Sequence, residues 1–283
     1  MPTPAIWSLR GRSFEWGQRT YLMGVLNVTP DSFSDGGEFN TPAAALAQAQ
    51  QLVAAGADII DVGGQSTRPG SGEISLEEEL DRVLSVLQVL RQEIPVPISV
   101  DTTRADVASA GVEAGADMVN DISGGTFDPD MLPTVAQLNV PIVLMHIRGT
   151  PQTMQHLTDY QDLIGEIYQF LETRISVAIS SGIDKSQIII DPGVGFAKTY
   201  DQSLEIFRRL KVFRSLSCPI LVGPSRKSFI GRILNQPDPK RRVWGTAAAC
   251  CAAIAGGADI LRVHDVKQMQ DVCRVADAVF RNC

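Results

Sequence analysis

The chain has 283 residues, a formal net charge of −7 and an apolar content of 44%, enough for one large core. The acidic balance argues against nucleic acid and anionic membranes as partners, since both require a basic field, and it favours a small-molecule partner. No run approaches the ~20 apolar residues that span a bilayer, and the first 17 residues lack a signal-sequence core, so we expect a cytoplasmic protein with no membrane partner.

Residues 6–17 come before the first buried apolar run and are predicted to form a short hairpin over the amino-terminal end of the fold. Eight apolar runs follow, and their continuous character is typical of parallel strands covered on both faces. These runs span residues 21–27, 58–63, 97–101, 117–121, 141–146, 187–191, 219–223 and 259–264. Amphipathic helical patterns lie between them.

Strand and helix alternate eight times, which predicts the α/β class and a closed (β/α)8 TIM barrel. The triplet Gly-Ala-Asp recurs at residues 56–58, 115–117 and 257–259, each time between a helix end and a buried strand. An open doubly wound sheet is the alternative, because eight strands can also splay without closing. No linker composition interrupts the chain, so residues 1–283 are predicted to form one domain, with a hairpin segment at 1–19 and the barrel at 20–283.

Polar residues stand where the predicted strands end, and chemistry in such folds sits at the carboxyl ends of the strands. In chain order these tips carry Asn27, GGQSTR at 63–68, Asp101, Asn120 with Asp121, Met145 with His146, Asp191, SRK at 225–227, and Arg262 with His264. The cations gather at the last two tips, where barrels often bind phosphate. The helix predicted after residue 225 would add backbone N–H donors. We therefore expect an anion site in an otherwise acidic protein.

Asp101, Asn120, Asp191 and Lys227 form a second group, which offers acceptors, an amide and a cation. This combination suits a flat heterocycle with a guanine-like edge, and spacing alone does not distinguish a pterin from a purine. Structural alternatives remain for single members. Asp101 could cap a helix over 103–111, and Asn120 with Asp121 could form only a turn.

Eight segments carry a family resemblance: MGVLNVTPDSFSDGG (23–37), GGQSTRPG (63–70), SVDT (99–102), VNDISGG (119–125), LMHIRGTPQTMQ (144–155), DPGVGFAK (191–198), GPSRKSFIG (223–231) and RVHDV (262–266). They resemble the dihydropteroate synthases, from about residue 20 to the end and at every strand tip in order. The resemblance implies a transferase of folate (tetrahydrofolate) biosynthesis. It would condense 6-hydroxymethyl-7,8-dihydropterin diphosphate with 4-aminobenzoate and release pyrophosphate.

By motif position, the resemblance assigns residues to each part of the reaction. The pterin would be held by Asp101, Asn120, Met145, Asp191 and Lys227, with Asp101, Asp191 and Lys227 acting in catalysis. The diphosphate would be held by Asn27, Arg68, Arg262 and His264, and Asn27 would also be the protein ligand of Mg2+. The 4-aminobenzoate pocket would use Phe33, Thr67, Pro69, Phe196, Lys227 and Ser228.

The resemblance also implies a dissociative route, in which departure of pyrophosphate leaves a cation delocalised over the dihydropterin. Asp101 and Asp191 could stabilise that cation, while Mg2+ and the basic side chains stabilise the departing anion. Phe33 and Phe196 are expected on glycine-flanked loops that close as a lid, with core plugs as the alternative. A homodimer and sensitivity to sulfonamides are further implications of the resemblance.

Three other functions share part of this residue pattern. A methyltransferase barrel that passes a methyl group from methyltetrahydrofolate to a corrinoid protein would share the pterin edge but would not need Asn27, Arg262 and His264 for a diphosphate. A silent pterin-binding module would be expected to lose part of the site. A sugar-phosphate barrel with Lys227 as Schiff base explains the cations but not the pterin-edge carboxylates and amide together.

Overall fold

The computed structural model describes residues 6–29, 42–68 and 70–281. Its first element is an antiparallel hairpin of β1 (Ile6–Leu9) and β2 (Arg12–Glu15). Arg10 and Gly11 both have positive φ, 52° and 72°, which is the backbone that a two-residue hairpin turn requires. The predicted amino-terminal hairpin is therefore present.

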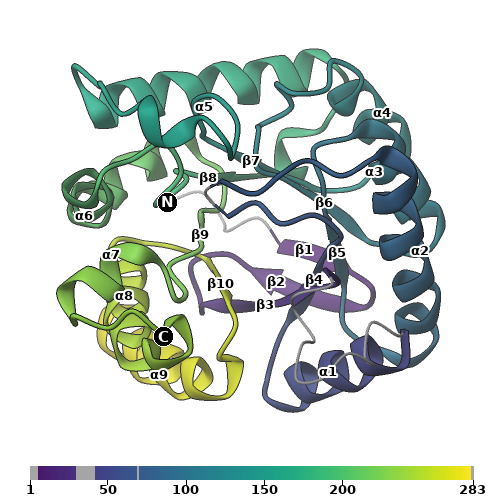
Figure 1. The fold of residues 1–283 in the computed structure, drawn as a ribbon, viewed down its shortest axis with the longest axis horizontal. Coiled ribbons are helices and arrows are strands. Elements are labelled where there is room, and N and C mark those ends of the chain that lie inside the picture. Colours follow the sequence, from purple (N-terminus) through teal and green to yellow (C-terminus); the bar gives the residue numbers. More distant parts are fainter. Residues whose placement is uncertain (1–5, 30–41, 69, 282–283) are drawn as a thin grey trace.

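The second sheet consists of eight parallel strands: β3 (Tyr21–Asn27), β4 (Ile59–Gly63), β5 (Ile98–Asp101), β6 (Met118–Asp121), β7 (Ile142–Met145), β8 (Ile188–Asp191), β9 (Leu221–Val222) and β10 (Ile260–Val263). Their order is β8-β7-β6-β5-β4-β3-β10-β9. A parallel bridge between Ile190 and Ile220 joins the two ends of this order, so the sheet is a nearly closed barrel (Figure 1). The predicted (β/α)8 barrel is confirmed, and the open doubly wound alternative is wrong.

Helices surround the strands on the outside of the barrel (Figure 1). They are α1 (Pro42–Ala54), α2 (Leu76–Glu93), α3 (Ala105–Glu113), α4 (Met131–Leu138), α5 (Leu163–Ser180), α6 (Tyr200–Arg209), α7 (Ser228–Ile233), α8 (Val243–Ala255) and α9 (Val266–Phe280). None of the helices in the described part of the chain has the length and apolar character to cross a membrane.

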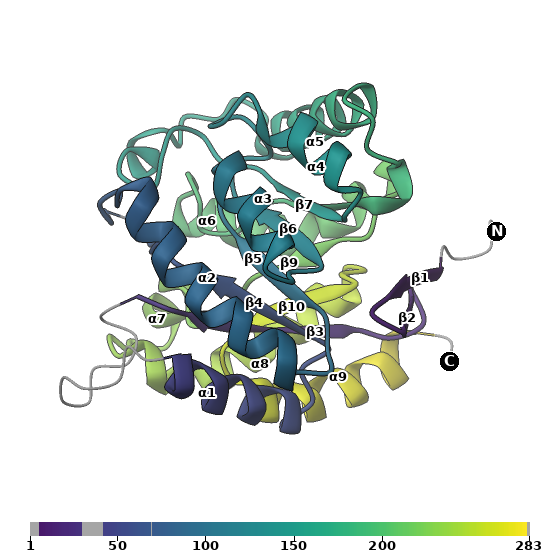
Figure 2. The same ribbon diagram turned by 90° about the vertical axis from the view of Figure 1, so that its right-hand side faces the viewer.

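The interior of the barrel changes from apolar to polar along the strands. Near the amino ends, Met23, Ile59 and Val143 pack with the hairpin residues Trp7 and Phe14 in one buried cluster. The hairpin therefore fills the end of the barrel opposite the strand tips, and Figure 2 shows it at the right-hand side of the molecule. Toward the carboxyl ends the inward side chains become polar, and these build the site described below.

The recurring Gly-Ala-Asp triplet has a physical explanation at the amino-terminal rim. Its aspartates, Asp58, Asp117 and Asp259, accept the backbone N–H at or near the start of a neighbouring strand, from Leu22, Ile98 and Ile220, at 2.8–3.0 Å. Each also lies near an arginine: Arg19, Arg91 or Arg281. The glycines have φ of 94–113°, which lets the chain turn directly from helix to strand. The triplet is thus a repeated structural joint.

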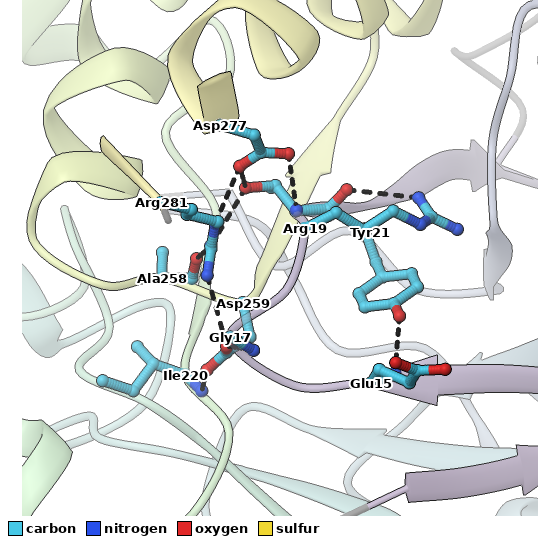
Figure 3. A network of polar contacts seen from close by, with 10 residues as sticks. Glu15, Gly17, Arg19, Tyr21, Ile220, Ala258, Asp259, Asp277 and Arg281 are labelled. Carbon is cyan, nitrogen blue, oxygen red and sulfur yellow. Dashed lines mark hydrogen bonds and ion pairs between the residues drawn. The ribbon is translucent and has the colours of Figure 1, made fainter. Parts of the chain in front are cut away.

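Figure 3 shows the third joint, where the chain between the hairpin and β3 meets α9. Asp259 accepts the Gly17 N–H at 3.1 Å, and Asp277 on α9 accepts the Thr20 N–H at 2.8 Å and Arg281 Nε at 2.7 Å. These contacts fix the closed, amino-terminal end of the barrel.

Candidate active site

Arg262 is the centre of the polar layer inside the barrel. Its Nε donates to Asp61 Oδ2 at 2.6 Å, and its Nη2 donates to Asp101 Oδ2 at 2.7 Å. The two carboxylates raise the pKa of the guanidinium against the effect of burial, so Arg262 is a permanent cation here. Three strands, β10, β4 and β5, thus contribute to one buried charge cluster.

Asp101 lies at the tip of β5 and is 7% exposed. Burial raises the pKa of its carboxyl to about 7; Arg262 opposes this shift, and Asp61 adds to it. The predicted capping alternative is wrong, because the N–H of Ala105 at the start of α3 donates instead to Asp128 Oδ2 at 2.7 Å.

Asn120 and Asp121 have different roles: Asp121 forms a turn, and Asn120 belongs to the polar layer. Asp121 accepts the backbone N–H groups of Ser123 and Gly125, both at 2.7 Å, and forms the turn after β6. Asn120 takes no part in that turn. It lies beside Asp101 in strand register, and its Nδ2 donates to Asp61 Oδ2 at 3.1 Å.

Asp191 at the tip of β8 and Lys227 at the start of α7 are close enough for each charge to shift the pKa of the other group. Asp191 Oδ1 accepts the Gly193 N–H at 2.7 Å, and burial raises the pKa of this carboxyl although Lys227 opposes the shift. Burial lowers the pKa of Lys227 to about 8, with Asp191 acting in the other direction. Lys227 Nζ donates to the Val194 carbonyl and lies 4.6 Å from the centroid of the Phe196 ring.

Met145 forms a small apolar cluster with Ile122, Ile147 and Met154, and Phe196 packs against it from a half-buried position. Met145 is the register partner of Asp191. An apolar surface therefore lies directly beside the carboxylate, as a flat ring with a polar edge requires.

His264 is held by Ser225, whose Oγ lies 3.0 Å from its Nδ1 and accepts its backbone N–H at 3.1 Å. Burial, with Arg226 and Arg262 adding to it, lowers the pKa of the imidazole to about 3. His264 is thus neutral near pH 7, and it is not one of the cations of the last tips. Arg226 also turns away, since its guanidinium pairs with Asp265 at 2.6 Å.

Asn27 is half-buried at the tip of β3 and pairs in register with Gly63 of β4. Arg68 is exposed on the loop after β4, close enough to His264 to lower the pKa of its imidazole. The described residues include no group of three His, Cys, Asp or Glu side chains that could hold a metal ion.

The residues assigned to 4-aminobenzoate lie around Lys227 and beside Asp101. Ser228 is exposed as the first residue of α7. Thr67 lines a cavity of about 430 Å3 together with Asp101 and Ile122. Phe33 and Pro69 lie outside the described residues.

One residue of the layer was not predicted. Asp61 is fully buried in β4 and receives hydrogen bonds from both Arg262 and Asn120. Its signal in the sequence is a carboxylate inside the apolar run IIDVGG, two residues before the strand tip. A charge in such a position needs a partner, which should have marked it as part of the site.

His146 and Lys198 form a buried pair next to the loop that carries Phe196. Lys198 is 3% exposed, and its Nζ lies 2.9 Å from His146 Nδ1 and donates to the Phe196 carbonyl at 2.8 Å. Burial lowers the pKa of both groups, to about 2 for His146, and each cationic form would also repel the other. The pair holds the loop of Phe196 in place.

Comparison with known proteins gives this arrangement a family. The pterin-binding enzymes match residues 23–264. The dihydropteroate synthase of Synechocystis sp. is 62% identical over 268 residues, which cover 95% of this chain and 93% of that protein.

Solved structures agree. A Xanthomonas albilineans dihydropteroate synthase with 4-aminobenzoic acid has a TM-score of 0.92 at 42% identity and covers 98% of both chains. A Yersinia pestis dihydropteroate synthase in complex with a sulfonamide drug has a TM-score of 0.91 at 41% identity, covering 97% of this chain and 98% of that one. The chain therefore belongs to the pterin-binding enzymes, as a member of the dihydropteroate synthase family.

Proposed function

We propose that Arg262 separates two binding regions of the polar layer. The pterin ring binds on one side of it, called the ring side, and the diphosphate binds on the other, called the anion side. As a dihydropteroate synthase, the protein joins 6-hydroxymethyl-7,8-dihydropterin diphosphate to 4-aminobenzoate and releases pyrophosphate. The observation that supports this proposal is the position of Arg262. It donates to Asp101 on one side, and on the other it lies at the tip of β10 together with His264.

On the ring side, Asp101, Asn120, Asp191 and Lys227 hold the edge of the pterin, and Met145 packs against its face. All but Lys227 are less than one-tenth exposed. Carboxylates accept paired N–H groups, whereas the lysine donates to a ring oxygen or nitrogen. The structure supports this assignment by bringing five strand tips to one place.

On the anion side, Arg262, His264, Asn27 and Arg68 hold the diphosphate. Arg262 supplies the buried charge, and no described residue bonds to its Nη1. His264 contributes as a neutral donor, because its Nδ1 faces Ser225 and its other ring nitrogen remains for the ligand. The exposed position of Arg68 suits a contact made when the loop after β4 closes.

The chemistry follows from where charge develops. When the bond to pyrophosphate breaks, positive charge spreads over the dihydropterin and faces Asp101 and Asp191. Lys227 has a pKa of about 8, so it is mostly protonated near pH 7 and donates to the ring. The arylamine then attacks the CH2 group as a neutral nucleophile, so no strong base is needed.

The second substrate is proposed to lie against Phe196, with Thr67, Lys227 and Ser228 around it and with Phe33 and Pro69 completing the pocket. The Lys227 cation over the Phe196 ring offers a partner for the aminobenzoate carboxylate. Sulfonamides would compete for this pocket.

Mg2+ is proposed as the cofactor, held by the amide oxygen of Asn27. Magnesium keeps most of its waters and binds through few protein ligands plus substrate phosphates, so a single neutral oxygen fits it. When bound, it would neutralise charge on the departing pyrophosphate. Asn27→Ala should abolish the Mg2+-dependent part of pyrophosphate binding in calorimetry, and an unchanged dependence would remove Asn27 from the metal site.

A homodimer is proposed to form through α8 and α9, which pack side by side at the lower left of Figure 1. Trp244 on α8 and Val275 and Val279 on α9 are 76%, 67% and 66% exposed. The alanines at 248 and 252 leave room for close approach of a second copy. Val275→Asp should give monomers in sedimentation velocity, whereas Ile179→Asp, on the exposed face of α5, should not.

A cytoplasmic location is also proposed. The four described cysteines are free, which suits a reducing compartment.

The rival reaction is methyl transfer from methyltetrahydrofolate to a corrinoid protein. Arg262 and His264 at one tip favour a diphosphate instead. Incubating the protein with each substrate set separates the two. Formation of 7,8-dihydropteroate supports the proposal, and demethylation of methyltetrahydrofolate without dihydropteroate would refute it.

A further inference from the structure

Asp61 connects two parts of the site that the strand order keeps apart. One oxygen, Oδ2, accepts from Arg262 Nε at 2.6 Å and from Asn120 Nδ2 at 3.1 Å. Arg262 lies on β10 and Asn120 on β6, each two strands away from β4 in opposite directions. The carboxylate therefore acts across the interior of the barrel, from a position that is 0% exposed.

We propose that Asp61 is a positioning residue for the reaction, which orients Arg262 toward the diphosphate and Asn120 toward the pterin ring. This inference rests on the roles proposed above for those two residues. Asp61 itself touches no reacting atom.

The geometry shows how the orientation is set. Asp61 and Asp101 occupy Nε and Nη2 of Arg262, so the plane of the guanidinium is fixed and Nη1 is left for an anion. A carboxylate offers only acceptors, so it holds the amide nitrogen of Asn120 and prevents the amide from turning over. The carbonyl oxygen of Asn120 is then available to a donor of the ring.

Stability alone does not explain this carboxylate. An apolar side chain would continue the layer of Met23 and Ile59 below it and would avoid the cost of burying a charge. Asp61 Oδ1 is buried and has no hydrogen-bond partner among the described residues, and neither does Ser99 Oγ, on its register partner in β5. The fold keeps a costly group whose bonds all go to two residues of the site.

Asp61 also acts on Asp101 through charge. Besides burial, the groups that shift the pKa of Asp101 are Arg262, which lowers it, and Asp61, Glu79 and Asp121, which raise it. Removing the charge of Asp61 should therefore lower the pKa of Asp101 below about 7.

The test compares Asp61→Asn with Ser99→Ala, which removes the neighbouring buried oxygen; among the described residues that oxygen has no hydrogen bond to Arg262 or Asn120. The measured quantity is the ratio of affinities for the dihydropterin diphosphate and for the free hydroxymethyl dihydropterin, because this ratio isolates the contribution of the anion side. Asp61→Asn should reduce it by about ten- to a hundredfold in the wild-type background. In an Arg262→Gln background the same change should reduce it by less than about threefold, because the arginine through which it acts is gone.

Two further readouts complete the design. Pterin affinity is expected to fall at acid pH as Asp101 becomes protonated, and this fall is the acid limb of the pH profile. In Asp61→Asn the acid limb should move to lower pH. Ser99→Ala should leave both the acid limb and the affinity ratio unchanged. An equal loss of the ratio in both backgrounds, with the limb in place, would overturn the inference.

Failure of the inference and failure of the proposed roles are distinguishable. A wild-type protein that does not prefer the diphosphate, or an Arg262→Gln variant that keeps the preference, contradicts the proposed roles. If those two behave as proposed and Asp61→Asn matches Ser99→Ala, only the positioning role is wrong. Should Asp61→Asn fail to fold, NMR of the ligand-free wild type decides: the Arg262 Nε–H, assigned with Arg262→Lys, should be protected from exchange, and rapid exchange would overturn the inference.

Discussion

Arg262 on β10 and Asp101 on β5 form an ion pair with an Nη2–Oδ2 distance of 2.7 Å, although 161 residues separate them in the chain. The pair links the cation proposed to bind the diphosphate to a carboxylate proposed to bind the pterin ring. Protonation of Asp101 and binding of the diphosphate should therefore influence each other.

Binding of the pterin ring should improve as pH rises through about 7, the pKa of Asp101 in the ligand-free protein. Only the ionised carboxyl accepts N–H bonds with both oxygens. The probe is free 6-hydroxymethyl-7,8-dihydropterin, which lacks a titrating diphosphate. Its affinity should fall about tenfold per pH unit on the acid side and level off on the alkaline side. Asp101→Asn should show no such limb, and a flat wild-type profile would contradict the assignment.

Stability of the ligand-free protein should change in the opposite direction over the same range. The folded-state pKa of Asp101 is raised from 3.8 to about 7, so the folded protein holds a proton that the unfolded chain has lost. Stability from this group is therefore present at low pH and lost as pH rises from about 4 to about 7. Asp101→Asn should gain in melting temperature relative to wild type as pH increases. A difference that does not depend on pH would argue against the raised pKa.

Asp191→Asn should weaken pterin binding by at least about tenfold, because an amide donor then faces a donor of the ring in a buried site. Its thermal stability should hold or rise, since burial already raises the pKa of this carboxyl and disfavours its charge. Melting and pterin titration on the same variant provide the test. A large drop in melting temperature with unchanged affinity would make Asp191 a structural residue, through its bond to Gly193.

Arg262→Gln should weaken binding of the dihydropterin diphosphate by about ten- to a hundredfold more than binding of the free alcohol, since a charge-assisted bond contributes ~1.5–3 kcal/mol. Arg226→Gln is the matched control, because this arginine stands at the neighbouring tip but pairs with Asp265. Competition titrations with both ligands measure the difference. Equal losses of affinity for the two ligands would mean that Arg262 binds the pterin ring or has a structural role, and that it does not bind the diphosphate.

Binding of 4-aminobenzoate should depend on prior binding of the anion. The pocket around Phe196 is proposed to be completed by Phe33 and Pro69, so the empty protein should bind 4-aminobenzoate poorly. Calorimetry with and without pyrophosphate and Mg2+ tests this expectation. Comparable affinity in both conditions would mean that the pocket is preformed and that no lid is required.

The barrel could be predicted because its signals are local. Each parallel strand is a continuous apolar run, and the described strands differ from the predicted runs by no more than about two residues at an end, within ordinary boundary uncertainty. The strand-tip residues follow from the same rule, since the carboxyl ends of the strands share one face. The Gly-Ala-Asp triplet is visible as a repeat in the sequence, but only the tertiary structure shows that its aspartate accepts a hydrogen bond from a neighbouring strand.

The charge states could not be predicted from residue types. His264 was grouped with the cations, yet burial beside two arginines lowers its pKa to about 3. Arg226, at the neighbouring tip of β9, is a second cation of the sequence pattern, but its guanidinium pairs with Asp265. Asp61 has a local signal, since it is a carboxylate inside an apolar run, but its partner Arg262 lies 201 positions away on β10 and cannot be identified from a local pattern. These features depend on distances across the barrel.

The most direct test of the account is pyrophosphate release by the purified protein supplied with 6-hydroxymethyl-7,8-dihydropterin diphosphate, 4-aminobenzoate and Mg2+. We expect release that depends on 4-aminobenzoate and equals the amount of 7,8-dihydropteroate formed. We also expect Ser99→Ala to match the wild type in this assay. Absence of release that depends on 4-aminobenzoate, from protein that is folded and binds the pterin, would contradict the account.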